Sequence, residues 1–292
     1  MNRKITPYLY VAPTIIFMLV FIYYPIIQNF YFSFFRMSAY SSTRAFIGLD
    51  HYIRLLHDPV ILIALKNNSY YAIISLICQV GFGLVIALVI ESKYVGKLRV
   101  FFRTTYFIPS VISITVVSIM WWFIYRPDIG MLNSILRYLG LGNLAMAWLG
   151  NSKTAIFAII AMSQWHYTGY IAMLLIIAIQ KVPVELYEAA DIDGASGFQK
   201  ARYITIPRIK GMLVVTSVIT IIGAFKVFNE VQVMTHGGPG NASQVLGTYL
   251  NRAAWLYDET GYAATIGVLM FVITFTASLI QIKLSKIQKE DN

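Results

Sequence analysis

The densest set of polar side chains inside an apolar stretch lies at positions 163–170, which read SQWHYTGY. Aromatic rings can stack on the apolar C–H face of a sugar, while hydroxyl and amide groups can hydrogen-bond to its hydroxyls. This segment supplies both kinds of group and is therefore a candidate carbohydrate-binding surface. A helix-packing patch with an interfacial aromatic belt explains the same residues equally well from the sequence alone.

Catalytic and metal-binding residues do not occur in recognisable patterns. The sequence has no Gly-rich, Lys-containing phosphate loop, so we do not expect the chain to hydrolyse ATP by itself. Zinc-protease spacing and a nucleophile elbow are also missing, and His51, His57 and His236 lack metal-ligand spacing. Cys78 is the single cysteine and lies in an apolar run, which favours a small packed hydrophobe. We expect no catalytic residue, metal or cofactor in this chain.

A charged segment at positions 181–211 reads PVELYEAADIDGASGFQKARYITIPRIKG from Pro183 onwards. Pro183 suits the first turn of a helix, and Glu188 lies early enough to favour the positive helix end. Asp193 and Gly194 predict the end of that helix. Pro207 predicts the end of a second one. Small side chains along the first helix would allow close approach to another protein, although an amphipathic connector resting on lipid headgroups fits this loop alone.

Two further patterns predict local structure, one in this loop and one in a later apolar segment. Phe198 and Tyr203 alternate with Lys200 and Arg202, which predicts an amphipathic second helix in the loop. Lys226 and Glu230 stand four residues apart in a later apolar segment. That spacing favours a local helical ion pair, with a role in gating or partner contact as the alternative.

The composition places these residues in a membrane. Hydrophobic residues make up 58% of the 292-residue chain and charged residues only 12%, about half the charged share of a typical soluble domain. The net charge of +10 could indicate nucleic acid, but apolar runs separate the basic residues. We therefore expect a lipid bilayer and no nucleic acid as the surroundings of the chain.

Six stretches are long and apolar enough to cross a bilayer as helices. They are residues 8–30, 69–90, 104–125, 154–180, 212–233 and 262–284. These spans predict an all-α polytopic membrane protein, folded as a single domain over residues 1–292. Of the 23 Lys and Arg residues, 14 fall in the segments on the side of the termini, which predicts cytoplasmic N- and C-termini.

The loop at 181–211 resembles the EAA motif of binding-protein-dependent ABC transporter permeases. The matching positions are Glu188, Ala189, Ala190, Gly194, Ile204, Ile206 and Pro207. Ile206 replaces the usual Leu, and Ala201 stands where the sugar branch usually has an aromatic residue. In that family the loop is a coupling helix that docks into a groove on the ATPase subunit. The resemblance implies that Glu188 makes a polar contact there and that Ala190 and Gly194 permit the close fit.

The resemblance extends over nearly the whole chain. The motifs are YLYVAP at 8–13, GLDHY at 48–52, FRTTYFIP at 102–109, WLG at 148–150 and THGGP at 235–239. They are similar to the maltose, glycerol-phosphate and lactose type of permease. This likeness implies a type I ABC importer fold in a prokaryotic cell membrane. It also implies a second permease subunit, two ATP-binding subunits that hold ATP and Mg, and an extracellular solute-binding protein.

The same likeness implies a substrate site near the membrane midplane. Matched motif by motif, its residues are Tyr106, Ser110, Ser163, Trp165, His166, Tyr167, Thr220 and Ala224. His166 and Ala224 replace larger or differently polar groups of the maltose carrier, which argues for another saccharide. For the coupling surface, the expected residues are Glu188, Ala189, Ala190, Asp193, Gly194 and Pro207.

Two other functions deserve comparison with an ATP-driven sugar importer. An ion-coupled secondary transporter usually places ionisable residues at mid-bilayer and often shows inverted repeats, and neither feature is visible in the sequence. A membrane-embedded enzyme would need a clustered acid–base or metal set, which is also not visible. The importer is therefore the function that the sequence favours.

Overall fold

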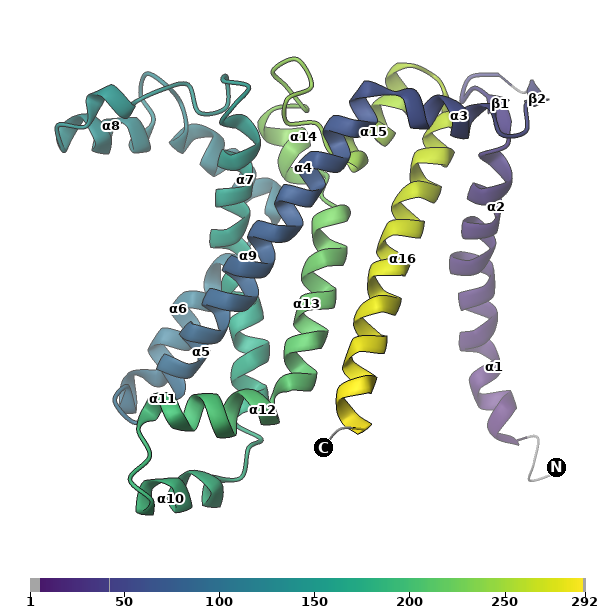
Figure 1. Ribbon diagram of the computed structural model, residues 1–292. Helices are drawn as coiled ribbons and strands as arrows, with labels where there is room; N and C mark the ends of the chain where they lie inside the picture. The colour runs from purple at the N-terminus through teal and green to yellow at the C-terminus, as the bar shows by residue number, and fades with distance from the viewer. Residues whose placement is uncertain (1–5, 42, 291–292) are drawn as a thin grey trace. The chain divides into compact units, whose positions relative to one another are not determined.

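The computed structural model describes residues 6–41 and 43–290, and it is dominated by helices (Figure 1). Tertiary contacts divide the chain into two compact units. Unit 1 comprises Met1–Ile61 with Tyr249–Val272, and unit 2 comprises Leu62–Thr248 with Ile273–Asn292. The expectation of one permease domain stays a prediction. The basic residues Arg3 and Lys4, used above for orientation, lie outside the described residues.

The apolar helices agree with a membrane-spanning chain. Within the described residues, four helices are long and apolar enough to cross a bilayer: Tyr10–Phe32, Pro59–Glu91, Lys210–Met234 and Thr260–Ile280. Two bent pairs raise the number to six if each counts as one span. They are Gly96–Val111 with Ile114–Ile124, bent by 93°, and Ala155–Ile179 with Val184–Ile192, bent by 76°.

Unit 1 joins the first helix to a small hairpin. Helix α1 (Thr6–Met18), a π-helical turn (Leu19–Tyr23) and α2 (Tyr24–Phe32) are followed by strands β1 (Phe35–Met37) and β2 (Arg44–Phe46), which pair antiparallel, and by α3 (Asp50–His57). A second π-helical turn (Arg252–Leu256) precedes α16 (Thr260–Glu290). The hydroxyls of Tyr249 and Tyr262 donate to one oxygen of Asp58, at 2.6 and 2.7 Å. The side-chain amide of Asn29 donates to the carbonyl of Ala264 at 3.1 Å.

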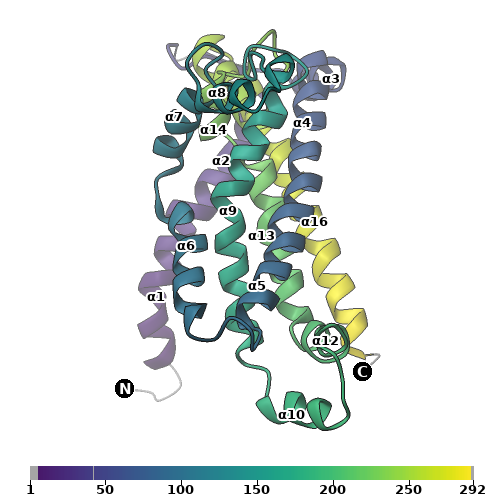
Figure 2. The same ribbon diagram turned by 90° about the vertical axis from the view of Figure 1, so that its left-hand side faces the viewer.

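The remaining helices lie in unit 2, apart from the start of α4 and the second half of α15, which belong to unit 1. They are α4 (Pro59–Ser75), the π-helix Leu76–Phe82, α5 (Gly83–Glu91), the 3-10 turn Gly96–Leu98, α6 (Arg99–Val111), α7 (Ile114–Ile124), α8 (Met131–Tyr138), the 3-10 turn Gly142–Leu144 and α9 (Ala155–Ile179). After these come α10 (Val184–Ile192), α11 (Gly197–Lys200), the π-helix Ala201–Thr205, α12 (Ile206–Arg208), α13 (Lys210–Phe225), α14 (Asn229–Met234) and α15 (Leu246–Asn251). Figure 2 shows α9 running the height of this unit between α6 and α13.

Helix α9 is the centre of unit 2. It packs against α5, α6, α7 and α13, and more than half of its residues are buried. Close packing depends on Gly169, because a Cβ atom there would lie 1.7 Å from the carbonyl oxygen of Tyr106 in α6. An apolar cluster with Ile159, Ile160 and Met162 continues the core towards α7 and α14.

Three of the expected spans differ from the structure, two by an internal break and one by its starting residue. The third span is not one straight helix: it breaks at Ile112 and Ser113, just after Pro109, which lacks the N–H that a regular helix needs. The second span begins ten residues earlier than expected, at Pro59. The fifth is interrupted between Phe225 and Asn229. A hydropathy profile detects how long an apolar stretch is. It does not detect a break within a helix, because a break depends on local backbone geometry.

Candidate functional site

A cavity of about 440 Å³ lies in unit 2, lined by residues of the second, third, fourth and fifth spans. Its lining is both aromatic and polar. It comprises Tyr71, Ser75, Gln79, Ser110, Ile114, Ser163, Tyr167, Tyr170, Ile171, Ile219, Thr220, Gly223, Ala224, Lys226, Val227, Phe228, Asn229 and Glu230. The size falls in the usual range for small-molecule sites.

Five of the eight residues expected at the substrate site line this cavity: Ser110, Ser163, Tyr167, Thr220 and Ala224. They come from three spans that are far apart in sequence. Helical periodicity explains the two on α9, because side chains four residues apart lie on the same face. Whether they contact substrate stays a prediction.

The other three expected residues lie outside the cavity lining. Tyr106 is half-exposed and lines a separate hollow beside Val85 and Phe102. Trp165 points away and places its ring 5.8 Å from that of Trp121. His166 is buried, and its ring lies 4.4 Å from that of Tyr167. Trp165 follows Ser163 by two residues, about 200° around the helix, so its side chain leaves the cavity face of α9. His166 follows by three residues and lies at the edge of that face, with its ring against that of Tyr167.

The second span also lines the cavity, a contribution that the sequence motifs did not predict. Tyr71, Ser75 and Gln79 recur every four residues from α4 into the π-helix that follows it, a spacing that predicts one polar stripe. Gln79 donates to the hydroxyl of Ser75 at 3.3 Å and to the side-chain oxygen of Gln164 at 3.1 Å. Gln164 in turn donates to Ser75 at 3.2 Å. The four-residue spacing of Tyr71, Ser75 and Gln79 is the sequence signal from which their place in the cavity could have been predicted.

Among the described residues of the cavity lining, Glu230 provides the one carboxylate. It is 5% exposed and accepts a hydrogen bond from the hydroxyl of Tyr71 at 3.0 Å. The expected Lys226–Glu230 ion pair is wrong, since none forms between these two described residues. The reason is local: α13 ends at Phe225 and α14 begins at Asn229, so the i, i+4 geometry does not exist.

Two hydroxyl groups in the lining have unused hydrogen-bonding capacity. Ser163 Oγ and Thr220 Oγ1 are buried and have no partner of ordinary geometry in the described part of the chain. Buried polar atoms normally find partners, so a hydroxyl-rich ligand or water in the cavity would satisfy them. The arrangement can bind a small polar molecule.

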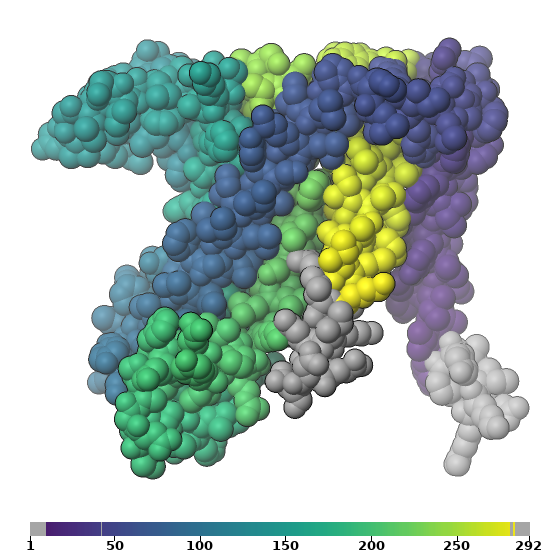
Figure 3. Space-filling view, in the orientation of Figure 1, coloured from purple at the N-terminus to yellow at the C-terminus, as the bar shows by residue number. Residues whose placement is uncertain are grey.

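The loop at 181–211 forms the expected pair of short helices, and it stands out from the end of unit 2 as a lobe in Figure 3. Helix α10 begins after Pro183 and ends at Ile192. Gly194 then adopts a φ of +73°, and the N–H of Ala195 donates to the carbonyl of Ala190 at 2.8 Å. A left-handed residue closing a helix in this way is usually glycine. The predicted helix end is confirmed.

The surface of α10 is open to a partner. Glu188, Ala189, Asp193 and Gly194 are exposed, and Ala190 is half-buried. A Cβ atom at Gly194 would meet nothing within 4 Å. Little side-chain bulk would therefore separate this backbone from a docked protein.

The second half of the loop differs from its prediction in two ways. Helical structure continues through Pro207 to Arg208, because Pro207 occupies the first turn of α12, where its missing N–H costs nothing. Phe198 and Tyr203 are 74% and 70% exposed, so the amphipathic face does not pack on the chain. The ammonium group of Lys200 donates a hydrogen bond to the carboxylate of Asp191 at 2.8 Å, and this interaction lowers the pKa of Asp191.

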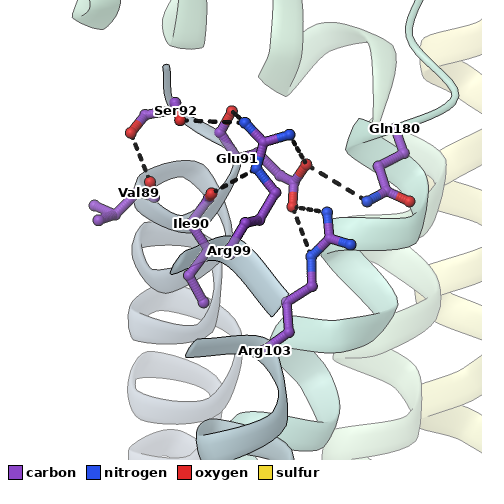
Figure 4. Close-up of polar contacts among 7 residues, drawn as sticks. All are labelled: Val89, Ile90, Glu91, Ser92, Arg99, Arg103 and Gln180. Carbon is purple, nitrogen blue, oxygen red and sulfur yellow. Dashed lines mark hydrogen bonds and ion pairs between the residues drawn. The ribbon is translucent and has the colours of Figure 1, made fainter. Parts of the chain in front are cut away.

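A charged cluster holds the base of the loop to two neighbouring spans (Figure 4). Arg103 of α6 lies 2.5 Å from Glu91, at the end of α5, and Arg99 lies 3.8 Å from the same carboxylate. Arg99 also donates to the carbonyl of Ile90 at 3.2 Å. The side-chain amide of Gln180, which caps α9 just before the loop, faces this cluster: its nitrogen lies 3.5 Å from Glu91, and with the amide turned over its oxygen accepts from Nη1 of Arg103 at 3.1 Å. The cluster therefore joins α5, α6 and α9 where the loop begins.

The bent and broken spans, the polar cavity between them and the protruding helical loop are the features of an importer permease. The chain matches the family described as "Binding-protein-dependent transport system inner membrane component" over residues 79–286. It belongs to this family.

Curated relatives match the whole length. The chain is 49% identical to "Probable ABC transporter permease protein YurN" of Bacillus subtilis, over 99% of both chains. It is 36% identical to "Arabinooligosaccharides transport system permease protein AraP" of the same organism, over 97% of this chain and 90% of that protein.

Solved structures give the same fold. A bacterial ABC transporter "involved in the import of the acidic polysaccharide alginate" matches with a TM-score of 0.85 and 25% identity, over 98% of this chain and 96% of that one. A second structure of a bacterial alginate ABC transporter, "in complex with alginate pentasaccharide-bound periplasmic protein", matches with a TM-score of 0.84 and 25% identity, over 97% and 95%. The all-α fold expected from the spans and motifs is confirmed as the type I importer permease fold.

Proposed function

We propose that this chain forms half of the translocation pathway of an ATP-driven, binding-protein-dependent oligosaccharide importer. The observation that carries the proposal is the cavity in unit 2. It combines the rings of Tyr71 and Tyr167 with the hydroxyls of Ser163 and Thr220, which have no hydrogen-bond partner of ordinary geometry among the described residues. Rings and hydroxyls together suit the two surfaces of a sugar, and one relative is named for arabinooligosaccharides.

Energy reaches the pathway through the loop. Glu188, Ala189, Ala190, Asp193 and Gly194 form an exposed surface of low bulk on α10, and it is the surface that a separate ATPase subunit would contact. Pro207 stabilises the return helix that leads into α13. ATP and Mg bind to that ATPase subunit, and this chain is not itself catalytic.

In the proposed complex, this chain pairs with a second, different permease subunit. Two ATPase subunits and an extracellular solute-binding protein complete the complex. The chain lies in a prokaryotic cell membrane with both termini in the cytoplasm. ATPase closure moves α10, and the Glu91 cluster at the base of the loop transmits that movement to α5, α6 and α9. The cavity then opens alternately to either side.

Copurification of the tagged chain and uptake in proteoliposomes test this function together. Gly194→Asp should abolish ATPase association and uptake, because it places a bulky carboxylate on the docking surface at a left-handed backbone position. Gly96→Asp is the matched control: Gly96 has a φ of +51° and an equally open surrounding, but lies in another loop.

Two results would contradict the proposal. In one, no ATPase subunit associates with the wild-type chain. In the other, Gly194→Asp leaves both assembly and uptake unchanged. Uptake driven by an ion gradient without ATP would favour a secondary transporter instead, in which the buried carboxylate of Glu230 would bind the coupling ion.

A further inference from the structure

The fifth span breaks after Phe225, at the end of α13, and α15 begins at Leu246. Residues 226–245 between these points form an excursion that contains α14 and the turn after it. Its first five residues line the cavity: Lys226, Val227, Phe228, Asn229 and Glu230. The position of the excursion therefore determines one wall of the cavity.

Each end of the excursion leaves a backbone group without a partner inside its helix, because the last carbonyls and the first N–H groups of a helix lie beyond its regular bonds. At the end of α13, the carbonyls of Ile222 and Gly223 share the N–H of Lys226, at 3.1 and 3.0 Å. The carbonyl of Ala224 and the N–H of Leu246 remain, and both residues are buried. A buried polar group without a hydrogen bond is costly, so both groups need a partner from elsewhere in the chain.

The side chain of Asn68, in α4, is the partner of both groups. Its Nδ2 donates to the carbonyl of Ala224 at 2.7 Å, and its Oδ1 accepts from the N–H of Leu246 at 2.9 Å. Asn68 is buried, with 0% of its surface exposed, so solvent does not reach it to replace either bond. An amide suits this place, because it offers a donor and an acceptor on one planar group. One side chain thus ties the two ends of the excursion together.

Neighbouring contacts hold the same two ends. Asn67 donates to the carbonyls of Ala242 and Gln244, at 2.9 and 2.8 Å. Gly247 in α15 lies against the start of the excursion, because a Cβ atom there would be 2.6 Å from the carbonyl oxygen of Val227. All of these residues belong to unit 2. The excursion is therefore held at both ends, and Asn68 makes a hydrogen bond at each of them.

We propose that Asn68 is a positioning residue for transport: it fixes the excursion so that Glu230 faces the substrate. Asn68 is not among the described residues that line the cavity, so it acts through the residues that it holds in place. Tyr71, three residues further along α4, donates to Glu230 at 3.0 Å. The same face of α4 therefore holds both the excursion and its carboxylate. This assignment rests on the proposed function, since it takes the cavity as the sugar-binding site.

A double-variant cycle tests whether Asn68 acts through Glu230, with uptake by the complete complex measured in proteoliposomes. Asn68→Ala should lower the initial uptake rate roughly tenfold, the effect of leaving buried partners unpaired. Both changes disturb the same contact with the sugar. Asn68→Ala combined with Glu230→Gln should therefore lower uptake little further than either change alone. Ser69→Ala is the matched control, because Ser69 is exposed and its hydroxyl donates to the carbonyl of Leu65 in its own helix, at 2.8 Å.

Thiol accessibility tests the position of the excursion without depending on transport. Val227→Cys places a thiol on the buried start of the excursion, in a chain whose native cysteine is removed by Cys78→Ser. In the complex in lipid nanodiscs, Asn68→Ala should raise the rate at which N-ethylmaleimide modifies this thiol roughly tenfold. Native Cys78, half-buried in the second span, should react at the same rate with or without Asn68→Ala. Asn68→Ser keeps a hydroxyl able to make one of the two bonds. It should give smaller effects in both experiments, and it replaces Asn68→Ala if that variant does not assemble.

Three results would overturn the proposal. Losses that multiply in the double variant would mean that Asn68 stabilises the chain without positioning Glu230. Equal acceleration at Val227→Cys and at native Cys78 would mean that the whole unit loosens. Uptake and modification rates like those of Ser69→Ala would mean that the excursion keeps its position without Asn68. If the wild-type complex shows no ATP-dependent uptake, the proposed function fails, while the modification rates still decide whether Asn68 holds the excursion.

Discussion

Glu230 is the residue on which the chemistry of the cavity depends most. Burying an ionised carboxylate costs several kcal/mol unless it is paired or hydrogen-bonded. Glu230 is 5% exposed and has the hydroxyl of Tyr71 as its side-chain donor. Because Glu230 lines the cavity, its carboxylate would, under the proposed function, accept hydrogen bonds from hydroxyl groups of a bound sugar.

We predict that Glu230→Gln lowers oligosaccharide uptake roughly tenfold, because a hydrogen bond to a charged acceptor is worth about 1.5–3 kcal/mol. Initial uptake rates in proteoliposomes measure the effect, with the sugar chosen by a binding screen on the solute-binding protein. Tyr71→Phe should cause a smaller loss, since it removes one donor and keeps the carboxylate. Wild-type uptake by Glu230→Gln, in a complex that still assembles, would show that Glu230 stabilises the position of α14 and does not bind the substrate.

At the scale of secondary structure, the contact between α6 and α9 determines whether the cavity can form. Gly169 allows the two backbones to touch at Tyr106. Ser110 lies one turn further along α6, and Tyr167 lies on the adjacent turn of α9, and both line the cavity. A change in this crossing would therefore move two walls of the cavity at once.

Gly169→Ala should destabilise the chain by about 1–3 kcal/mol, the usual cost of overpacking, because its Cβ would clash with the backbone of α6. Thermal unfolding of the detergent-purified complex measures this. Gly211→Ala in α13 is the control, since a Cβ atom there would meet nothing within 4 Å. Equal melting temperatures for the two variants would mean that α6 and α9 can separate at no cost.

At the scale of the whole molecule, function depends on a connection between the loop and the spans. The connection runs from α10 to Gln180 at the end of α9, and from there to Glu91 and Arg103. Movement of a docked ATPase would reach three spans through this cluster. Under the proposed function, the exposed surface of α10 and the cluster at its base would therefore act together in coupling.

Glu188→Lys should leave the complex in the membrane but uncouple ATP hydrolysis from uptake, because it reverses a charge on the docking surface without touching the cavity. ATPase rate and sugar uptake are measured side by side in the same proteoliposomes. Glu185→Lys, an exposed position in the first turn of the same helix, controls for the added positive charge. Unimpaired uptake by Glu188→Lys would refute the coupling role.

The sequence by itself determined the features that depend on local composition. Apolar length predicted a membrane chain, because lipid leaves few alternatives to helices. Asp193 followed by Gly194 predicted the end of α10, since a left-handed position strongly favours glycine. These conclusions need only residues that are neighbours in the chain.

The tertiary structure alone decided which side chains meet. The rotation of α9 turns Tyr167 into the cavity and Trp165 away from it, and the break after Phe225 sends Glu230 to Tyr71 and away from Lys226. Both outcomes depend on how helices distant in sequence pack together. The polar stretch at 163–170 contributes Ser163, Tyr167 and Tyr170 to the cavity lining, but which of its residues face the cavity became known only once α9 was packed against its neighbours.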